Sequence, residues 1–256
     1  MKEQTNKLNR RDFVKAGTVL ASGVAIAAAA LTPYDGLLFA AETPGAKGKW
    51  YGIGIDINKC IGCGKCANAC KLENNVPKDP FYFRSWVEQY TIKNDGSVLV
   101  ESPNGGINGF KQSVPDKDIY KSFFVPKMCN HCAKSPCTQV CPVGATFETE
   151  EGIVLVDETY CIGCRYCVQA CPYGCRYIHP EKGTVDKCTL CFHRLKKGMQ
   201  PACFEICPTE ARIFGDLNDP KSKLNYFLKN HTCMVVKPHL NTGSKLFYNA
   251  ISPEVR

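Results

Sequence analysis

The sequence predicts an α+β fold of short strands and helices joined by long loops, organised as two small modules with one nested within the other. Three observations predict it. Sixteen of the 18 cysteines fall into four groups of four with related spacing. Short stretches of alternating apolar residues precede three of these groups, as strands would. Glycine and proline are frequent, with 21 and 16 of 256 residues, which favours loops over long regular elements.

The clearest cysteine group is Cys161-Ile-Gly-Cys164-Arg-Tyr-Cys167-Val-Gln-Ala-Cys171-Pro172. Its spacing, C-x2-C-x2-C-x3-C-P, is that of bacterial ferredoxins, which bind 4Fe-4S clusters. The first three cysteines of such a run bind one cluster. The helix that follows carries the fourth cysteine away to the other cluster of a pair. Gly163 lets the loop curl, and Pro172 removes an amide N–H just beyond the last ligand.

Three further groups repeat this run with altered gaps. They are Cys60, Cys63, Cys66 and Cys70, with the same spacing; Cys129, Cys132, Cys137 and Cys141, with two extra residues before the third cysteine; and Cys188, Cys191, Cys203 and Cys207, with eleven residues between the second and third. Four complete quartets predict four 4Fe-4S clusters. The alternative is structural zinc bound by C-x2-C pairs, but zinc would leave the fourth cysteine of each run without a role.

The distances between runs predict which of them pair. Only 19 residues separate Cys141 from Cys161, so the second and third runs are expected to form one compact module with a β-hairpin between them. The first and fourth runs flank this module and are left to pair with each other. The predicted segments are an outer ferredoxin-like module at 50–122 plus 181–235 with an insertion at 71–122, a nested ferredoxin-like module at 123–180, and a C-terminal tail at 236–256.

This pairing assigns the ligands, because the fourth cysteine of each run binds the partner run's cluster. The predicted sets are Cys60, Cys63, Cys66 and Cys207 for cluster 1; Cys188, Cys191, Cys203 and Cys70 for cluster 2; Cys129, Cys132, Cys137 and Cys171 for cluster 3; and Cys161, Cys164, Cys167 and Cys141 for cluster 4. The alternative is that each run encloses its own cluster. No residue is predicted to be catalytic.

Five other residues near the runs have two interpretations each. Cys175 and Cys233 are interpreted as small buried thiols, with a disulfide between them as the alternative. His131, Lys65 and Arg165 lie within the cluster loops. They are interpreted as packed or solvated side chains, with tuning of a cluster as the alternative.

Strand-like alternation occurs at four places outside the insertion, namely 51–57, 123–125, 152–156 and 211–214. The insertion holds Trp86–Tyr90, a predicted strand at Ser97–Val100, and a Gly/Asn/Pro turn at 103–109. We interpret it either as a surface hairpin or as a docking surface for a partner, since a stretch of this length without ligands favours neither.

Residues 1–40 are predicted to be a twin-arginine export signal. Arg10 and Arg11 are followed by a phenylalanine, a lysine and a mild apolar stretch, Ala16–Leu31. That stretch is too short and too weakly apolar for a transmembrane helix, and a membrane-anchoring helix is the alternative. The twin-arginine route carries folded proteins, so clusters can be inserted first. The expected location is therefore the periplasm or the outer face of the cytoplasmic membrane.

The formal charge of +8 does not indicate a nucleic-acid partner. Residues 1–40 contribute +2 of it. Each oxidised cluster with four thiolates carries about −2, so four clusters bring the loaded mature chain to roughly −2. The basic residues therefore balance the clusters. The sequence also lacks a nucleotide-binding Gly-rich loop, a C-x-x-C-H haem site and a Ser/His/Asp arrangement.

Two segments carry a resemblance to a known family: Met128-Cys-Asn-His-Cys-Ala-Lys-Ser-Pro-Cys-Thr-Gln-Val-Cys-Pro-Val-Gly-Ala145 and Gly163-Cys-Arg-Tyr-Cys-Val-Gln-Ala-Cys-Pro-Tyr173. They resemble the four-cluster electron-transfer (beta) subunits of the molybdopterin oxidoreductase family, of the dimethyl sulfoxide, polysulfide, thiosulfate and tetrathionate reductase type. Val236–Gly243 resembles the end of these subunits. Cys164 is intact, which implies four cubane clusters. Lys71 stands where the other runs have proline, but the ligand before it is present.

The resemblance implies an electron-transfer subunit with no substrate chemistry of its own. Electrons are expected to pass one at a time between an integral membrane quinone-reactive subunit and a molybdopterin catalytic subunit. The catalytic subunit is expected near the cluster of the first and fourth runs. The alternative is a partner that contains a cytochrome or a hydrogenase. The mature chain is expected to have no transmembrane helix of its own.

Overall fold

Small sheets and short helices make up the part of the chain that the structure describes. The structure is a computed structural model, and it describes residues 48–79 and 81–255. The predicted export signal at 1–40 lies outside these residues. Four sheets are present in the described part, with strand orders β10-β11-β1-β9, β3-β2-β4, β5-β6 and β7-β8. The prediction of an α+β fold is confirmed.

The first sheet joins segments from both ends of the described residues. Its strand β1 (Tyr51–Asp56) pairs parallel with β11 (Leu246–Asn249) and antiparallel with β9 (Arg212–Asp216), while β10 (Cys233–Met234) extends the sheet beyond β11. The strand predicted before the first cysteine run is thus confirmed. The apolar stretch of the C-terminal tail lies beside it in the sheet.

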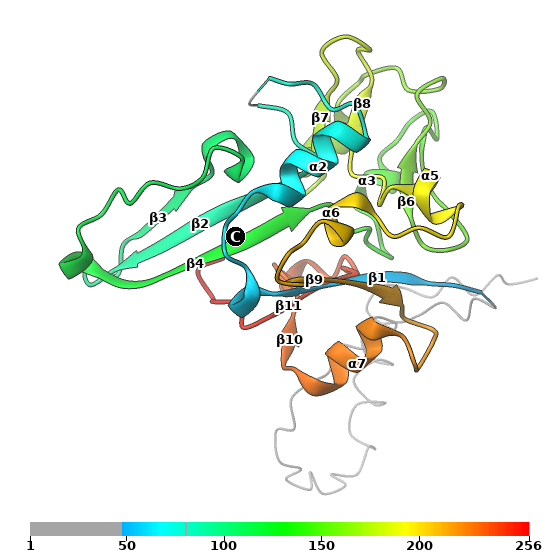
Figure 1. Cartoon of the computed structure of the whole chain (residues 1–256). Helices are drawn as coiled ribbons and strands as arrows, with labels where there is room; N and C mark the ends of the chain where they lie inside the picture. Colours follow the sequence, from blue (N-terminus) through cyan, green and yellow to red (C-terminus); the bar gives the residue numbers. More distant parts are fainter. Residues whose placement is uncertain (1–47, 80, 256) are drawn as a thin grey trace, which may run out of the picture. The chain divides into compact units, whose positions relative to one another are not determined.

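Alternating glycine and isoleucine in β1 serve its two faces. Ile53 and Ile55 are fully buried in the main core. On the other face, a Cβ at Gly54 would lie 2.7 Å from the ring of Phe227, which belongs to α7 (Lys223–Asn230). The glycine therefore allows α7 to pack directly on the strand (Figure 1).

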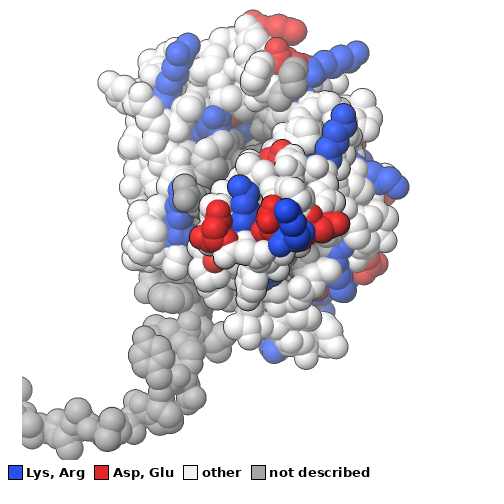
Figure 2. All heavy atoms as spheres, turned by 90° about the vertical axis from the view of Figure 1, so that its left-hand side faces the viewer, with Lys and Arg blue, Asp and Glu red and all other residues white. Residues whose placement is uncertain are grey.

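The second sheet is built largely from the predicted insertion. Strands β2 (Ser85–Lys93) and β3 (Val98–Glu101) form an antiparallel hairpin, and the long β4 (Ile119–Met128) pairs with the other edge of β2. The strand β4 runs directly into the second cysteine run. Figure 2 shows the face at the far end of this sheet, where acidic and basic side chains are interspersed and neither sign dominates.

Two short hairpins lie between cysteine runs. Strands β5 (Thr146–Glu148) and β6 (Val154–Val156) form the hairpin predicted between the second and third runs. Strands β7 (Arg176–Ile178) and β8 (Val185–Lys187) form a second one, between the third and fourth runs, which the sequence analysis did not predict. Strands of three residues that contain charged side chains give little alternation to detect.

Each cysteine run leads into a short helix whose second residue is the third cysteine of that run. These helices are α2 (Lys65–Glu73), α3 (Pro136–Gln139), α4 (Tyr166–Gln169) and α6 (Ala202–Glu205), while α5 (Phe192–Leu195) occupies the long gap of the fourth run. Helix α2 packs against α6 (Figure 1), and α3 packs against α4. The helices of the first and fourth runs therefore lie together, as do those of the second and third.

The remaining helical turns are of the 3-10 type: η1 (Ile57–Lys59), η2 (Pro103–Gly106), η3 (Asp116–Asp118) and η4 (Pro238–Leu240). The longest helix in the described range is α2, with nine residues. Among residues 48–79 and 81–255, no helix is long and apolar enough to cross a membrane.

Candidate metal centres

The loops that present the cysteines share one backbone feature. In each run the residue just before the second cysteine has a positive φ, and these residues are Gly62 (68°), His131 (43°), Gly163 (67°) and Leu190 (53°). This left-handed residue turns the chain between the first two sulfurs. Glycine readily adopts this conformation at two of the four positions, whereas nothing in the sequence indicates it at His131 and Leu190.

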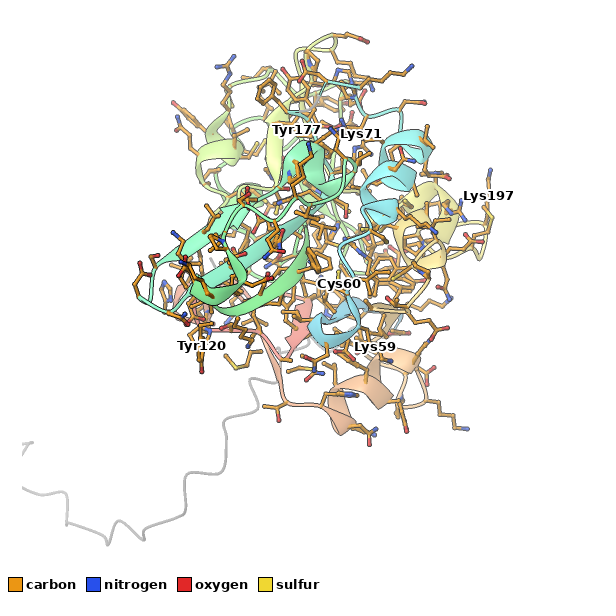
Figure 3. All side chains as sticks on the ribbon, turned by 60° about the vertical axis from the view of Figure 1, so that its left-hand side comes forward. Lys59, Cys60, Lys71, Tyr120, Tyr177 and Lys197 are labelled. Atoms are coloured by element: carbon orange, nitrogen blue, oxygen red, sulfur yellow. The ribbon has the colours of Figure 1, made fainter. Side chains whose placement is uncertain are left out.

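The first centre contains cysteines from the first and fourth runs. Burial raises the pKa of Cys60 to about 11, and the charges of Cys66 and Cys207 add to this effect. Cys207 therefore lies close to Cys60 although 146 residues separate them in the sequence. In Figure 3, Cys60 follows Lys59 at the start of the loop that leads into α2. Cys63, in the same loop, is exposed.

The second centre gathers Cys70 with the fourth run. Burial, and then the charges of three neighbouring thiols, raise the pKa of Cys70 well above its usual value; these neighbours are Cys203, Cys188 and Cys191. The side-chain amide of Asn74 lies 3.7 Å from the sulfur of Cys70 and 3.6 Å from that of Cys191. All four thiols are buried.

In the third centre, a single cavity is lined by all four predicted ligands together with Tyr173 and Arg176; these ligands are Cys129, Cys132, Cys137 and Cys171. Burial raises the pKa of Cys132 to about 12, and the charge of Cys129 adds to this. In contrast, the polar thiol of Cys175 beside it lowers the pKa of Cys171 to about 6. The second and third runs thus meet around one space.

The fourth centre is brought together in part. Cys161 and Cys167 belong to one apolar cluster with Val154 and Val185, and Cys164 in the same loop is exposed. The sulfur of Cys161 accepts a hydrogen bond from the amide of Val185 at 3.4 Å. No described contact joins the sulfur of Cys141 to the other three predicted ligands. The helix before it, α3, nevertheless packs against α4 of the third run.

The chain matches known iron–sulfur proteins over nearly its whole described length. The family described as "4Fe-4S dicluster domain" matches residues 59–145 and again residues 120–217. A tetrathionate reductase subunit of Salmonella typhimurium is 39% identical over 243 residues, which are 94% of this chain and 87% of that protein. One of the chains of polysulfide reductase from Wolinella succinogenes is 38% identical over 200 residues, with 78% and 93% covered. The arsenate respiratory reductase iron-sulfur subunit of a Shewanella species is 34% identical, with 77% and 94% covered.

The chain is a member of the iron–sulfur subunits of the molybdopterin oxidoreductase family. The predicted electron-transfer subunit, without a catalytic role of its own, is thereby confirmed, and so are its four 4Fe-4S clusters.

The two extra cysteines of this iron–sulfur subunit are free thiols. Cys175 is buried in the main core, and its sulfur donates to the carbonyl of Met128 at 3.2 Å. Cys233 is half-buried in a separate apolar cluster around Leu224 and Phe227. No disulfide joins Cys175 to Cys233.

Three buried cations of the iron–sulfur subunit lie among the cysteines, and no sequence pattern predicts them. Arg176 donates to the sulfur of Cys137 at 2.9 Å, and Arg212 lies 3.8 Å from that of Cys203. Lys187 is 1% exposed beside Cys188. The Nε of Arg212 is buried without a hydrogen-bond partner among the described residues. Thiols surrounded by buried cations and free donors fit an anionic group such as a thiolate-bound cluster.

His131 of the iron–sulfur subunit is a neutral donor. Its Nδ1 accepts a hydrogen bond from the amide of Val154 at 3.1 Å, so the proton of the neutral ring lies on Nε2. Burial, and then the charges of Lys187, Lys245 and Arg176, lower the pKa of His131 well below its usual value. Its Nε2 is buried without a partner among the described residues. This N–H is therefore available to a group bound in the loop of Cys129 and Cys132.

Proposed function

We propose that this subunit relays electrons through four clusters between an integral membrane quinone-reactive subunit and a molybdopterin catalytic subunit, in an anaerobic respiratory oxidoreductase. A bound 4Fe-4S cluster takes up and releases one electron at a time. The chain's own residues hold the clusters, exclude water from the inner ones and leave the outer ones near the surface. A cytochrome- or hydrogenase-containing partner complex is the alternative.

The ligand sets of the proposal are those predicted from the sequence, with two ferredoxin-like modules, one nested in the other. The observation that carries it is the meeting of runs that are distant in sequence. Cys70 lies with the fourth run, Cys207 lies beside Cys60, and Cys171 lines one cavity with the second run. If each run enclosed its own cluster, these fourth cysteines would lie with their own first three.

The exposure of two cysteines supports the proposal that electrons enter and leave the subunit through clusters 1 and 4. Among the 18 cysteines, only Cys63 and Cys164 are exposed, one in the loop of cluster 1 and the other in the loop of cluster 4. Exposed apolar side chains lie next to both: Ile61 is 59% exposed and Ile162 is 65% exposed. Partners that dock on these loops would shield the apolar residues and approach the two end clusters.

Iron and acid-labile sulfide analysis of anaerobically purified protein tests the cofactor content. We expect about 16 of each per chain, four for each complete quartet. Stoichiometric zinc with little iron would contradict the proposal.

The proposed location is the periplasm or the outer face of the cytoplasmic membrane, reached through the twin-arginine route. The support is the Arg10-Arg11 signal at the start of the sequence. Changing both arginines to lysine is expected to leave cluster-loaded precursor in the cytoplasm. The wild-type chain, followed in the same fractionation, is the control. Export of the double variant at the wild-type level would rule out this route.

A further inference from the structure

We propose that Arg212, Lys187 and Arg176 are shared counter-ions, each lying between two consecutive clusters and making both of them easier to reduce. This inference rests on the ligand sets proposed above. The three buried charges alternate with the four clusters. Arg212 lies between clusters 1 and 2, Lys187 between clusters 2 and 3, and Arg176 between clusters 3 and 4.

Arg212 begins β9 and is fully enclosed between the first and fourth runs. Its Nη1 lies 3.8 Å from the sulfur of Cys203, a ligand of cluster 2, and 3.2 Å from that of Met128. Its Nη2 donates to the hydroxyl of Ser85 at 2.8 Å. Its other electrostatic neighbours among the thiols are Cys66 and Cys60, which are ligands of cluster 1. The guanidinium thus faces ligands of two clusters.

Arg176 begins β7 and holds the same position between the second and third runs. Its Nη2 donates to the sulfur of Cys137, a ligand of cluster 3, and its Nη1 donates to Thr146 at 3.2 Å. The thiol of Cys167, a ligand of cluster 4, is another of its electrostatic neighbours. Like Arg212, it keeps its charge at any physiological pH, because a guanidinium does not lose its proton in proteins.

Lys187 ends β8, directly before Cys188. Its ammonium donates to the carbonyl of Cys188 at 2.7 Å and to that of Val154 in β6. The charge therefore lies between the fourth run and the β5–β6 hairpin of the second and third runs. Among the thiols, Cys129, a ligand of cluster 3, and Cys188, a ligand of cluster 2, interact most strongly with its charge.

The absence of carboxylates distinguishes these three cations from the other buried ones. Arg84 is paired with Asp186 at 2.8 Å and Lys245 with Glu148 at 3.0 Å. Within residues 48–79 and 81–255, no carboxylate pairs with Arg176, Lys187 or Arg212. A buried cation without a counter-ion is costly, so the negative charge that compensates each of them is that of the neighbouring clusters.

The expected consequence follows from charge. One-electron reduction adds a negative charge to a cluster, and a cation fixed nearby in a medium of low dielectric constant favours that state. Lys65 and Arg165 also lie in cluster loops, but both are exposed, and water screens their charges. The buried cations, and not the exposed cations of the loops, are therefore expected to set the differences in reduction potential between the clusters.

The test is an EPR-monitored redox titration of the full chain with its clusters, using dithionite as the one-electron donor. For Arg212→Met we expect the reduced-to-oxidised ratio of clusters 1 and 2 to fall at least tenfold at a given potential, which is 59 mV for a one-electron couple. Clusters 3 and 4 should be unchanged. Lys65→Met is the matched control: Lys65 is exposed in the loop of cluster 1, so its loss should shift cluster 1 much less than Arg212→Met does.

Lys187→Met should act on clusters 2 and 3 in the same way, with Lys197→Met as its control. Lys197 is exposed and lies at the edge of the molecule in Figure 3. Equal shifts in the buried and exposed variants, or equal shifts of all four clusters, would overturn the proposal. Iron analysis of the wild-type protein tests the proposed function separately, because it does not depend on these cations.

Arg212→Lys keeps the positive charge. If Arg212→Met loses clusters, this variant distinguishes loss of the charge from loss of the arginine's shape as the cause. Recovery of iron content and potentials in Arg212→Lys supports the counter-ion role. Loss of clusters from both variants would overturn it, since shape rather than charge would then be required.

Discussion

Cys70 and Cys191, from the first and the last cysteine run, both have their sulfur near one amide nitrogen, Nδ2 of Asn74, at 3.7 Å and 3.6 Å. The orientation of this amide is fixed from behind, because its Oδ1 accepts a hydrogen bond from Arg84 at 3.2 Å and Arg84 is paired with Asp186. The amide N–H groups therefore face the carbonyl of Cys70, at 3.1 Å, and the two sulfurs. This network ties the end of α2 to the fourth run and to β8.

The first prediction concerns the cluster that Cys70 serves. Cys70→Ser and Cys191→Ser are expected to alter the same EPR signal, while Cys60→Ser alters a different one, because the fourth cysteine of a run binds the partner run's cluster. EPR spectra of the reduced variants, with iron content measured in parallel, distinguish the signals. Cys70→Ser affecting the same signal as Cys60→Ser would show instead that each run encloses its own cluster.

The second prediction concerns the glycine within the third run. Gly163 has φ +67°, and a Cβ there would lie 2.4 Å from the carbonyl oxygen of Gly183, so Gly163→Ala must displace backbone. Gly174 has nearly the same φ, +64°, with open space around it. We expect Gly174→Ala to cost about 1 kcal/mol from the left-handed conformation alone, and Gly163→Ala about 3 kcal/mol.

Thermal unfolding of the two loaded variants measures this difference, at about 2–4 °C per kcal/mol for a chain of this size. The loss in Gly163→Ala should also appear in the iron content of cluster 4. Equal melting temperatures for the two variants would mean that the contact with Gly183 does not restrain the loop.

The third prediction compares two ion pairs of equal length. Arg84 and Asp186 are 2.8 Å apart with side chains 11% and 9% exposed, and Lys182 and Glu158 are 2.8 Å apart with side chains 49% and 47% exposed. Asp186→Asn leaves a buried arginine without its partner and is expected to cost about 3–5 kcal/mol. Glu158→Gln is expected to cost at most about 1 kcal/mol, since water screens the pair.

Urea unfolding under anaerobic conditions measures both values. Because Arg84 orients Asn74, Asp186→Asn should also change the EPR signal that Cys70→Ser changes. A similar small cost for both substitutions, with an unchanged spectrum, would contradict the role of this pair.

The cysteine spacing predicted the site more completely than the hydrophobic pattern predicted the fold, and the reason is physical. Three ligands of one cluster must lie within a few residues, so their geometry is local and visible in the sequence. The strand β1 was predictable because its alternation is strict. The strands β7 and β8 were missed, since each has three residues and carries a basic side chain in its pattern.

Burial of Arg176, Lys187 and Arg212 was not predictable from the sequence. Basic residues are solvated at most positions in proteins, and nothing in the residues adjacent in sequence distinguishes these three from the exposed Lys65 or Arg165. The same holds for the left-handed backbone at Leu190, which the fold imposes on a residue that disfavours it. Long-range packing decides both features.

The last prediction concerns the two exposed ends of the cluster chain. Ile61 and Ile162 are exposed beside Cys63 and Cys164, the two cysteines that the structure leaves accessible. Ile61→Glu and Ile162→Glu each place a charge that the docked partner would bury. Each substitution is therefore expected to weaken the association with one partner by about 2 kcal/mol, roughly 30-fold. Tyr226→Glu is the control, because Tyr226 is 70% exposed on α7, outside the cysteine runs.

Affinity purification of the tagged subunit from cells that make the whole complex measures these losses. Ile61→Glu should release the catalytic subunit and keep the membrane subunit, since we expect the catalytic subunit to dock near the first and fourth runs. Ile162→Glu should do the reverse. If both variants lose the same partner, or if Tyr226→Glu behaves like either of them, the two loops are not separate docking ends of the electron path.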